Sequence, residues 1–519
     1  MYFVIFIMGT DEARRVSLIA LSVIQAFCGA YGFIAPREAW VDNYRIRYIL
    51  NETELGSELK GINHKTDRVK SDPLTYESNY ALISDCAAIS YWSYGAAPDL
   101  ERVLRKEMGY DGDISYLMDT GGTVFSDALL GVKYSAAAVN PDKMLYDEME
   151  GRPHLFKSRY TLPFGVFIEP ENPKADDASF MEFHNLLFNE IYETDQKLIM
   201  EDSASEYISQ STPLTDEEAA KIRKFFDDNA PKERAYSLAM TEDTGAVNTD
   251  ETSDAGEASS KQEGDDTDSE TEYEDGKTYK HILSVPVSGL KSLYLCVPED
   301  YESTLTFIKD GEPVYFNSFI TYGSNYYPNG LRNGIQALGT YEDETYEVEL
   351  YTEDKELKDV SIGMLDLDLL SEAVKASAAE VNLNTVCGKK GLRMNGSVNK
   401  DGRLFIPVAY SDSWSAKVNG RDAKIIPCID NAFISLDVSK GNVDIKLTYR
   451  PKGLMTGLCL TALGIVFAIL LAMFLKKGGL KGKKSEKVFD RIFIYAFNSV
   501  AAAMFIIMYI IPIYIKMAI

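Results

Sequence analysis

Three aromatic side chains crowd one short string of the sequence. The string AAISYWSYG places Tyr91, Trp92 and Tyr94 beside Ser90 and Ser93. Aromatic faces stack on sugar rings and neighbouring hydroxyls bind sugar hydroxyls, so the string predicts a contact with a glycan. Clustered aromatic residues also close a hydrophobic core, or lie at the level of lipid headgroups where Trp and Tyr are favoured. A binding role and a packing role therefore both stay open.

Metal and cofactor chemistry has no support in the sequence. The four histidines, at positions 64, 154, 184 and 281, are scattered without the spacing of zinc ligands. The signatures of serine hydrolases, P-loop enzymes and dinucleotide-binding domains are missing as well. We therefore expect no metal site and no bound cofactor.

The cysteines do not form a framework. No CxxC pair occurs among the six cysteines. Cys387 and Cys428 are close enough in sequence to share a domain, where a disulfide is permitted outside the cell, as it is for Cys86 and Cys296. The favoured alternative is that these cysteines are free thiols.

The negative charge of the chain is unevenly distributed. The formal charge is −26, and the segment Glu242–Asp275 holds 14 acidic residues against the single base Lys261. Residues 240–278 have almost no large apolar side chain, so they predict a disordered acidic linker between two domains. No basic stripe occurs outside the loop 476–491, which argues against nucleic acid as a partner.

Three apolar stretches predict a membrane protein. Residues 453–475 contain no charged side chain, and a helix of about 20 residues crosses a bilayer core of about 30 Å. Residues 16–35 and 492–515 predict two further spans. The loop 476–491 carries seven Lys or Arg against two acids, which marks it as cytoplasmic. The sequence thus predicts a multi-pass protein of the cell membrane with residues 36–452 outside.

The first nine residues, MYFVIFIMG, are apolar but too short to span a membrane. Within the predicted segment 1–35 we interpret them as the tail of an earlier helix, so that the chain is the C-terminal portion of a larger multi-pass protein. A short amphipathic lead-in is the alternative.

The region predicted to lie outside the membrane divides into domains that differ in their pattern of apolar and polar residues. Residues 36–239 predict an extracytoplasmic α/β domain, with an amphipathic helix over 180–199 and a helix start at the capping box Thr215–Glu218. Residues 279–382 alternate in short runs typical of an antiparallel sandwich and include a brief helix over 368–379. Residues 383–452 predict a second, membrane-proximal β domain. The fold class is thus a membrane protein with few transmembrane helices, a large α/β region and β-sandwich-like units.

Several strings, in order, resemble the YfhO family of bacterial multi-pass membrane proteins. The best match is FIPVAYSDSWSAKVNGRDAKI followed by DNAFISLDV and GNVDIKLTYRPKG, with Trp414, Gly420, Asn431, Phe433 and Tyr449 at the family's positions. Upstream, YRIR, SNYAL, AAISYWSYG, FSDALLGVKY and LPFGVFI resemble its extracytoplasmic segments. The resemblance covers most of residues 10–519, except for the acidic linker.

The resemblance implies a glycosyltransferase-like protein that takes sugar from a polyprenyl-phosphate donor and glycosylates an envelope polymer such as lipoteichoic acid. Its partners would be the lipid bilayer, the lipid-linked sugar and the polymer or glycan acceptor. In such enzymes the catalytic acid lies in the first extracytoplasmic loop, a portion that this sequence lacks. No catalytic residue is therefore assigned. The rival hypothesis is a non-catalytic, membrane-anchored envelope protein that binds glycans or partner proteins.

The candidate substrate-binding residues are Asn79, Tyr91 and Trp92, each within a family-like string. Two acids, Asp85 and Asp127, also lie in or beside such strings and could serve a sugar transfer as a base. The structural alternatives are a turn for Asp85 and a helix cap for Asp127.

Overall fold

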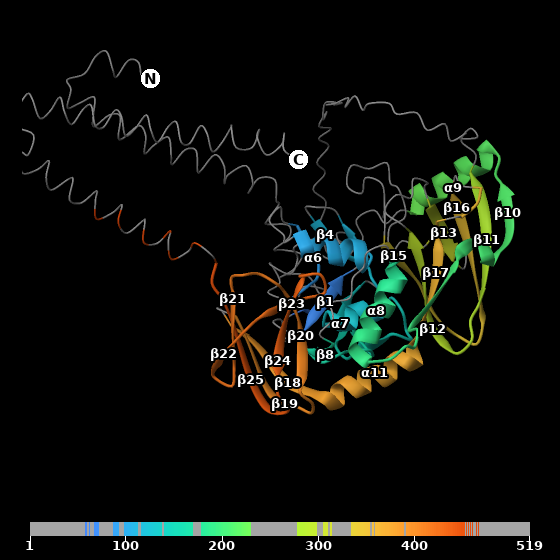
Figure 1. Cartoon of the computed structure of the whole chain (residues 1–519). Coiled ribbons are helices and arrows are strands. Elements are labelled where there is room, and N and C mark those ends of the chain that lie inside the picture. The colour runs from blue at the N-terminus through green and yellow to red at the C-terminus, as the bar shows by residue number, and fades with distance from the viewer. Residues whose placement is uncertain are drawn as a thin grey trace, which may run out of the picture. The chain divides into compact units, whose positions relative to one another are not determined.

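The computed structural model of the chain describes residues 58–59, 62, 67–71, 87–92, 98–112, 116–137, 140–169, 178–229, 278–297, 305–309, 312–313, 334–352, 355–357, 359–388, 391–451, 453, 455, 457, 459, 463 and 466. They fall into two units, residues 1–449 and residues 450–519. The first unit consists mainly of antiparallel sheets with few helices (Figure 1).

Two small sheets lie in the first part of the chain. One has the order β1-β5-β7-β6 and comprises β1 (Arg68–Ser71), β5 (Val132–Ala136), β7 (Arg152–Ser158) and β6 (Tyr146–Met149). The other has the order β2-β4-β3 and comprises β2 (Tyr91–Trp92), β4 (Tyr116–Gly121) and β3 (Tyr110–Gly112). Among the named strands of the described residues, β1 and β5 form the one parallel pair.

Short helices accompany these sheets. They are α6 (Pro98–Arg102), the π-helical turn η1 (Val103–Glu107), α7 (Val124–Leu129), α8 (Phe180–Tyr192), the 3₁₀ turn η2 (Ala204–Tyr207) and α9 (Asp216–Asn229). Helix α8 ends where Glu193 adopts a left-handed backbone with φ of 50°. The capping box at Thr215 and Glu218 begins α9 as the sequence predicts, with reciprocal bonds between the two residues.

A sandwich of two sheets follows. One sheet has the order β10-β11-β16-β13-β14 and comprises β10 (Ile208–Pro213), β11 (Tyr279–Pro286), β16 (Thr345–Thr352), β13 (Leu305–Lys309) and β14 (Glu312–Pro313). The other has the order β15-β12-β17-β9 and comprises β15 (Gly334–Glu342), β12 (Leu290–Val297), β17 (Ser361–Asp366) and β9 (Ile199–Ser203). Apolar residues of both sheets, such as Leu283, Val348 and Leu295, share one core.

A second pair of sheets is joined to the first by α11 (Leu367–Glu380). One sheet has the order β18-β19-β25-β21-β22 and comprises β18 (Val381–Gly388), β19 (Gly391–Val398), β25 (Gly441–Tyr449), β21 (Trp414–Val418) and β22 (Arg421–Ala423). The other has the order β23-β24-β20-β8 and comprises β23 (Ile426–Cys428), β24 (Phe433–Val438), β20 (Gly402–Ala409) and β8 (Val166–Ile168).

The expected α/β region needs correction. Residues 58–229 do mix helices with strands, but three of their strands complete sheets built later in the chain: β8 pairs with β20, β9 with β17, and β10 with β11. Antiparallel pairing needs no crossover helix, so sequence patterning alone does not reveal such distant partners. The domain limits at 239 and 382 stay predictions, and the sheets cross both of them.

The largest core unites these parts. It collects buried residues from η1, α7, α8, β12, α11 and the turn between β23 and β24, among them Phe125, Phe183, Tyr294, Leu370 and Ile429. Residues this far apart in sequence pack into one continuous apolar volume, so the first unit folds as an integrated module.

The membrane spans predicted at 16–35 and 492–515, the basic loop 476–491 and, apart from Thr278, the acidic linker 240–278 lie outside the described residues. Within 453–475 the described residues 455, 457, 459, 463 and 466 are helical. Among all described residues, no helix has both the length and the apolar character that a bilayer crossing requires.

Candidate functional site

The turn between β4 and α7 is built around glycine. Gly121 has φ of +86°, and a Cβ atom there would lie 2.2 Å from the main-chain oxygen of Gly109. That oxygen accepts hydrogen bonds from the main-chain N–H groups of Gly122, at 3.2 Å, and of Ile335, at 3.0 Å. The close approach excludes any side chain at position 121, so glycine fixes the path of the chain into α7.

The main-chain N–H groups at the start of helix α7 have hydrogen-bond partners. The Thr123 hydroxyl accepts a bond from the Ser126 N–H at 3.2 Å, and the Ser126 hydroxyl accepts one from the Thr123 N–H at 2.8 Å. The Val124 N–H donates to the Tyr294 hydroxyl at 3.0 Å. Three donors that a short helix would otherwise leave unpaired thus have partners.

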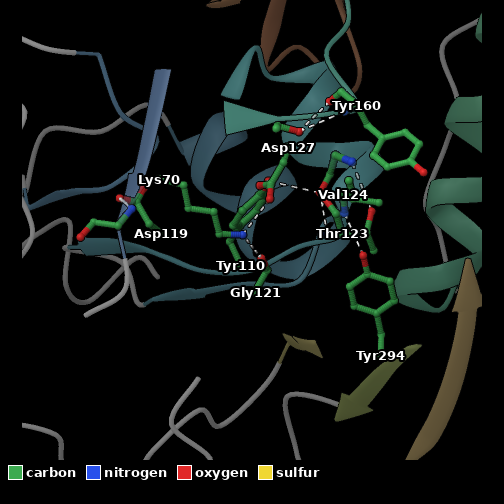
Figure 2. Close-up of polar contacts among 12 residues, drawn as sticks. Lys70, Tyr110, Asp119, Gly121, Thr123, Val124, Asp127, Tyr160 and Tyr294 are labelled. Carbon is green, nitrogen blue, oxygen red and sulfur yellow. Dashed lines mark hydrogen bonds and ion pairs between the residues drawn. The ribbon is translucent and has the colours of Figure 1, made fainter. Parts of the chain in front are cut away.

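Asp127 is the fourth residue of α7, four positions after the capping residue Thr123, and its carboxylate has two partners (Figure 2). Lys70 of β1 donates to Oδ2 at 2.9 Å, and the Tyr110 hydroxyl donates to Oδ1 at 2.7 Å. Lys70 also donates to the Gly121 main-chain oxygen at 3.0 Å. The expectation that Asp127 caps the helix is therefore wrong, because Thr123 already occupies the capping position.

The network is buried and keeps Tyr110 protonated. The side chains of Lys70 and Asp127 are 19% and 9% exposed. Burial, followed by the charge of Asp127, raises the pKa of Tyr110 well above its usual range. Burial likewise raises the pKa of Tyr294. Both phenols therefore act as neutral hydrogen-bonding groups at every physiological pH.

A second buried acid, Asp119 of β4, holds the aromatic string in place. Its carboxylate accepts bonds from the Ser90 N–H at 2.9 Å, the Ser90 hydroxyl at 3.1 Å and the Ser71 N–H at 3.1 Å. Ser90 directly precedes β2, whose Tyr91 and Trp92 pair with Leu117 and Tyr116 of β4. Asp119 thus ties the start of β2 to β1 and β4.

The structure brings only part of the predicted site together. Tyr91 and Trp92 form the short strand β2, and its pairing with β4 fixes their main chain. Asn79 and Asp85 lie outside the described residues. The substrate-binding role of Asn79, Tyr91 and Trp92 stays a prediction.

Sequence reasoning missed Lys70 and Asp119. In RVKS of β1, Lys70 lies between two buried residues, Val69 and Ser71, and the alternation was a usable signal for a strand. The Asp-Thr-Gly-Gly string at 119–122 was the other signal, since a double glycine marks a sharp turn. Neither signal shows that Lys70 and Asp127, 57 residues apart, meet.

His154 and His184 lie in separate environments and form no common site. His184 is fully buried in α8 and its Nδ1 contacts the Phe180 main-chain oxygen at 2.6 Å, whereas the His154 ring contacts the Glu58 carboxylate at 2.8 Å. Among the described residues, no group of three His, Cys, Asp or Glu side chains is arranged to hold a metal ion. Cys296, Cys387 and Cys428 are free thiols.

Comparison with known proteins gives one family. The family described as "Bacterial membrane protein YfhO" matches residues 2–461. A relative in Bacillus subtilis strain 168, named "Uncharacterized protein YfhO", is 26% identical over 125 residues. That match covers 24% of this chain and 14% of the relative, so it spans a small part of the relative's length. No solved structure matches the chain significantly.

Proposed function

The chain belongs to the YfhO family of bacterial membrane proteins, and on that premise we propose that it is part of a membrane glycosyltransferase. In the proposed reaction, sugar passes from a polyprenyl-phosphate donor to a hydroxyl of a cell-envelope polymer such as lipoteichoic acid. The acceptor oxygen bonds to the anomeric carbon, the bond from that carbon to the phosphate oxygen breaks, and polyprenyl phosphate leaves. The acceptor proton passes to a base that we assign to no residue of this chain.

In this proposal the module of residues 58–449 lies outside the membrane and positions the acceptor. Strand β25 ends at Tyr449, and the chain reaches the helical residue Met455 six positions later. The side chains of Met455, Leu463 and Val466 are 68%, 65% and 52% exposed. Exposed apolar side chains at these three helical positions fit a lipid environment, which supports a membrane anchor directly after the module.

The proposed acceptor role rests on the hydrogen bonds that Ser90 donates to the carboxylate of Asp119. Two hydrogen bonds from one residue to a buried carboxylate fix the main chain immediately before Tyr91 and Trp92. Strand β4, which supplies Asp119, continues into the glycine turn and then into α7. There the ion pair between Lys70 and Asp127 fixes α7 against β1. Binding residues held by such a rigid support lose little freedom when a ligand binds.

A specific observation also favours the non-catalytic alternative, an envelope protein that binds glycans without transferring sugar. The carboxylates of Asp127 and Asp119 are both engaged with donors inside the module. They therefore support the fold, and the module is suited to binding more than to proton transfer. The two hypotheses differ in whether cells that lack the gene change the sugar content of their envelope polymers.

The test uses cells in which the gene is deleted and then restored as the full-length protein. We expect deletion to lower the sugar content of the envelope polymer, and Trp92→Ala to lower it as well at unchanged membrane abundance. Met200→Ala, at a surface position that is 51% exposed, serves as the matched control and should restore the wild-type content.

Unchanged sugar content in the deletion strain would refute the transfer and leave the binding alternative. A deletion phenotype with full restoration by Trp92→Ala would keep the transfer but remove Trp92 from the acceptor site. Loss of the Trp92→Ala protein from the membrane would identify Trp92 as a packing residue.

A further inference from the structure

An aromatic pair lies at the point where the last strand leaves the second pair of sheets. Trp414, the first residue of β21, is opposite Tyr449, the last residue of β25. Their ring centroids are 5.0 Å apart, and the ring planes meet at 64°. The Trp414 ring packs against the core between the two sheets, and its Nε1–H donates to the Ala409 main-chain oxygen at 3.2 Å. The protein therefore supports one ring firmly, and the second ring rests against the first.

Tyr449 is exposed although it adjoins this core. Its side chain is 43% exposed, and its hydroxyl has no hydrogen-bond partner among the residues that the structure describes. Tyr and Trp combine an apolar ring with a polar group, which favours them where one end of the side chain meets lipid and the other meets water. An exposed tyrosine packed on a half-buried tryptophan therefore suits the level of lipid headgroups.

Two cations flank the aromatic pair. Arg450 directly follows β25. Ala423, the last residue of β22, is opposite Ala416 of β21, so the next residue, Lys424, lies at the same end of the sheet as the pair. Lys424 and Arg450 are both exposed, and neither forms an ion pair within the described part of the chain. Lys and Arg close to a bilayer are attracted to its anionic lipids.

The acids near this end of the sheet already have partners. They are Asp412, bonded by the Tyr410 hydroxyl at 2.9 Å, Asp430, paired with Arg102 at 3.1 Å, and Asp422, paired with Lys417 at 3.3 Å. Arg102 and Lys417 offset two of these three negative charges. Lys424 and Arg450 against Asp412 then leave a net positive charge beside the aromatic pair, although the whole chain carries −26.

The chain reaches a helical residue with an exposed apolar side chain soon after the pair. Met455 comes six positions after Tyr449 and is 68% exposed. Six residues of chain span at most about 20 Å, so a bilayer that surrounds this helix lies within reach of the pair. The headgroup region adds only about 5–7 Å to each side of the hydrocarbon core. The membrane surface is thus the partner that the covalent chain itself brings to the exposed rings.

We propose that this end of the sheet, defined by Trp414, Tyr449, Lys424 and Arg450 and called here the headgroup contact, rests on the anionic headgroups of the bilayer. The two rings lie at the level of the headgroups, and the two cations contact lipid phosphates. Strand β25 then stands on the membrane with its Tyr449 end, so the domain is held in one orientation. The inference rests on the membrane anchor proposed after the module, but it does not depend on the proposed sugar transfer.

The test measures quenching of tryptophan fluorescence by brominated lipids, with the full chain reconstituted in phosphatidylglycerol vesicles. The chain has three tryptophans, so Trp40→Phe with Trp92→Phe leaves Trp414 alone. Its emission should be quenched about twofold more strongly by lipid brominated near the headgroup than by lipid brominated near the acyl-chain ends, because tryptophan favours the headgroup level. Circular dichroism identical to that of the wild type verifies that the variant is folded.

Two other tryptophan positions serve as controls, each in a chain that carries Trp414→Phe as well. Val466→Trp reports on the anchor, and lipid brominated near the acyl-chain ends should quench it. Lys440→Trp lies at an exposed position directly before β25. The ends of this strand of nine residues are about 27 Å apart, so neither lipid should quench Lys440→Trp.

The contribution of the cations is measured on Trp414 in the same vesicles. Lys424→Gln with Arg450→Gln should lower the quenching to the level found in zwitterionic phosphatidylcholine vesicles, because the attraction to anionic headgroups is lost. Lys375→Gln with Lys440→Gln changes the net charge equally at exposed positions elsewhere and should leave the quenching unchanged. Equal effects of the two double variants would show a general charge effect and remove Lys424 and Arg450 from the contact.

The tryptophan positions separate the failure of this inference from the failure of the anchor. Quenching of Val466→Trp without quenching of Trp414 would overturn the headgroup contact and leave the anchor in place. No quenching at Val466→Trp would overturn the anchor and the contact together. Quenching of Lys440→Trp as strong as that of Trp414 would mean that the sheet lies flat on the bilayer, which contradicts the proposed orientation.

Discussion

The ammonium group of Lys70 lies 2.9 Å from Oδ2 of Asp127 and 3.0 Å from the main-chain oxygen of Gly121. One side chain of β1 thereby contacts both ends of the turn that leads from β4 into α7. The same Asp127 accepts a bond from the buried Tyr110 hydroxyl at 2.7 Å. Three segments that are distant in sequence are joined at one carboxylate, and this arrangement makes the network sensitive to loss of a single charge.

Replacement of Asp127 by Asn should therefore destabilise the protein. The change leaves the ammonium of Lys70, which is 19% exposed, without its anion, and removal of one partner of a largely buried pair costs about 2–4 kcal/mol. The double variant Asp127→Asn and Lys70→Met should recover part of this loss, because no unpaired charge remains. Chemical unfolding of the full chain in detergent measures both.

Lys221→Met provides the control, since Lys221 and Glu217 form a pair that is 70% and 80% exposed. Its loss should leave the unfolding midpoint unchanged. Equal effects of Asp127→Asn and Lys221→Met would contradict a special role for the buried pair.

The glycine turn gives a second prediction. Gly121→Ala forces a Cβ atom to within 2.2 Å of the Gly109 main-chain oxygen, so the backbone must move and the free energy of unfolding should fall by about 3 kcal/mol or more. Gly151→Ala is a matched control, because Gly151 has a similar φ of +71° and nothing within 4 Å of the added atom. It should cost only about 1 kcal/mol. Thermal unfolding of the two variants compares steric exclusion with backbone strain alone, and similar midpoints would refute the exclusion.

Asp119 should control the order of the aromatic string. In Asp119→Asn an amide nitrogen replaces one carboxylate oxygen and cannot accept the bond made there, either the Ser90 N–H bond to Oδ1 or the Ser71 N–H bond to Oδ2. Hydrogen exchange of the amides of residues 90–92 should accelerate at least tenfold, while that of α8 stays unchanged. The exchange rates separate a local positioning role from global unfolding. Unchanged exchange at residues 90–92 would show that the pairing of β2 with β4 suffices to hold the string.

A pH dependence follows from His184. Its ring is fully buried and burial lowers its pKa from 6.5 to about 4. The unfolded chain therefore binds a proton between about pH 6.5 and pH 4 that the folded chain excludes, so stability is lost as pH falls through this window. A shift of this size corresponds to about 3 kcal/mol. In His184→Phe the unfolding free energy should vary less over this range. An unchanged pH profile would place the dependence on other groups.

Local patterns in the sequence predict the elements of this fold well. The period of the apolar residues indicates α8, whose Phe183, Leu187 and Ile191 are buried. The predicted end at residue 199 is wrong, because the helix stops at Tyr192 and Ile199 begins β9. The start of α9 directly after Thr215 is predictable because its capping bonds join residues only three positions apart. The alternation along β25 gives the buried Val443, Ile445 and Leu447. In each case the interaction that decides the structure is close in sequence.

The site depends on distant contacts and could not be predicted in the same way. Strand β8 completes a sheet with β20, more than 200 positions later, and no local signal specifies this pairing. Asp127 illustrates the same difficulty at one residue. A helix start was predicted nearby, but Thr123 makes the cap and the charge of Asp127 is used to bind Lys70. Lys70 of β1 and Asp127 of α7 are 57 residues apart, so their contact exists only in the folded module.

The turn between β23 and β24 gives the last prediction. Ile429, Asp430 and Asn431 all have left-handed backbones, with φ of 49°, 48° and 64°, a conformation that L-residues other than glycine adopt at a cost. The Arg102 Nη1 atom lies 3.1 Å from Oδ2 of Asp430, and Ile429 is fully buried in the main core. Asn431 is exposed, so Asn431→Gly removes the cost without loss of a contact and should stabilise the protein by about 0.5 kcal/mol. Ile429→Gly relieves the same backbone but empties a buried position, and should destabilise it by about 2–4 kcal/mol. Opposite shifts of the thermal midpoint would show that core packing holds the turn in its conformation, whereas two stabilising changes would show that the strain exceeds the packing that opposes it.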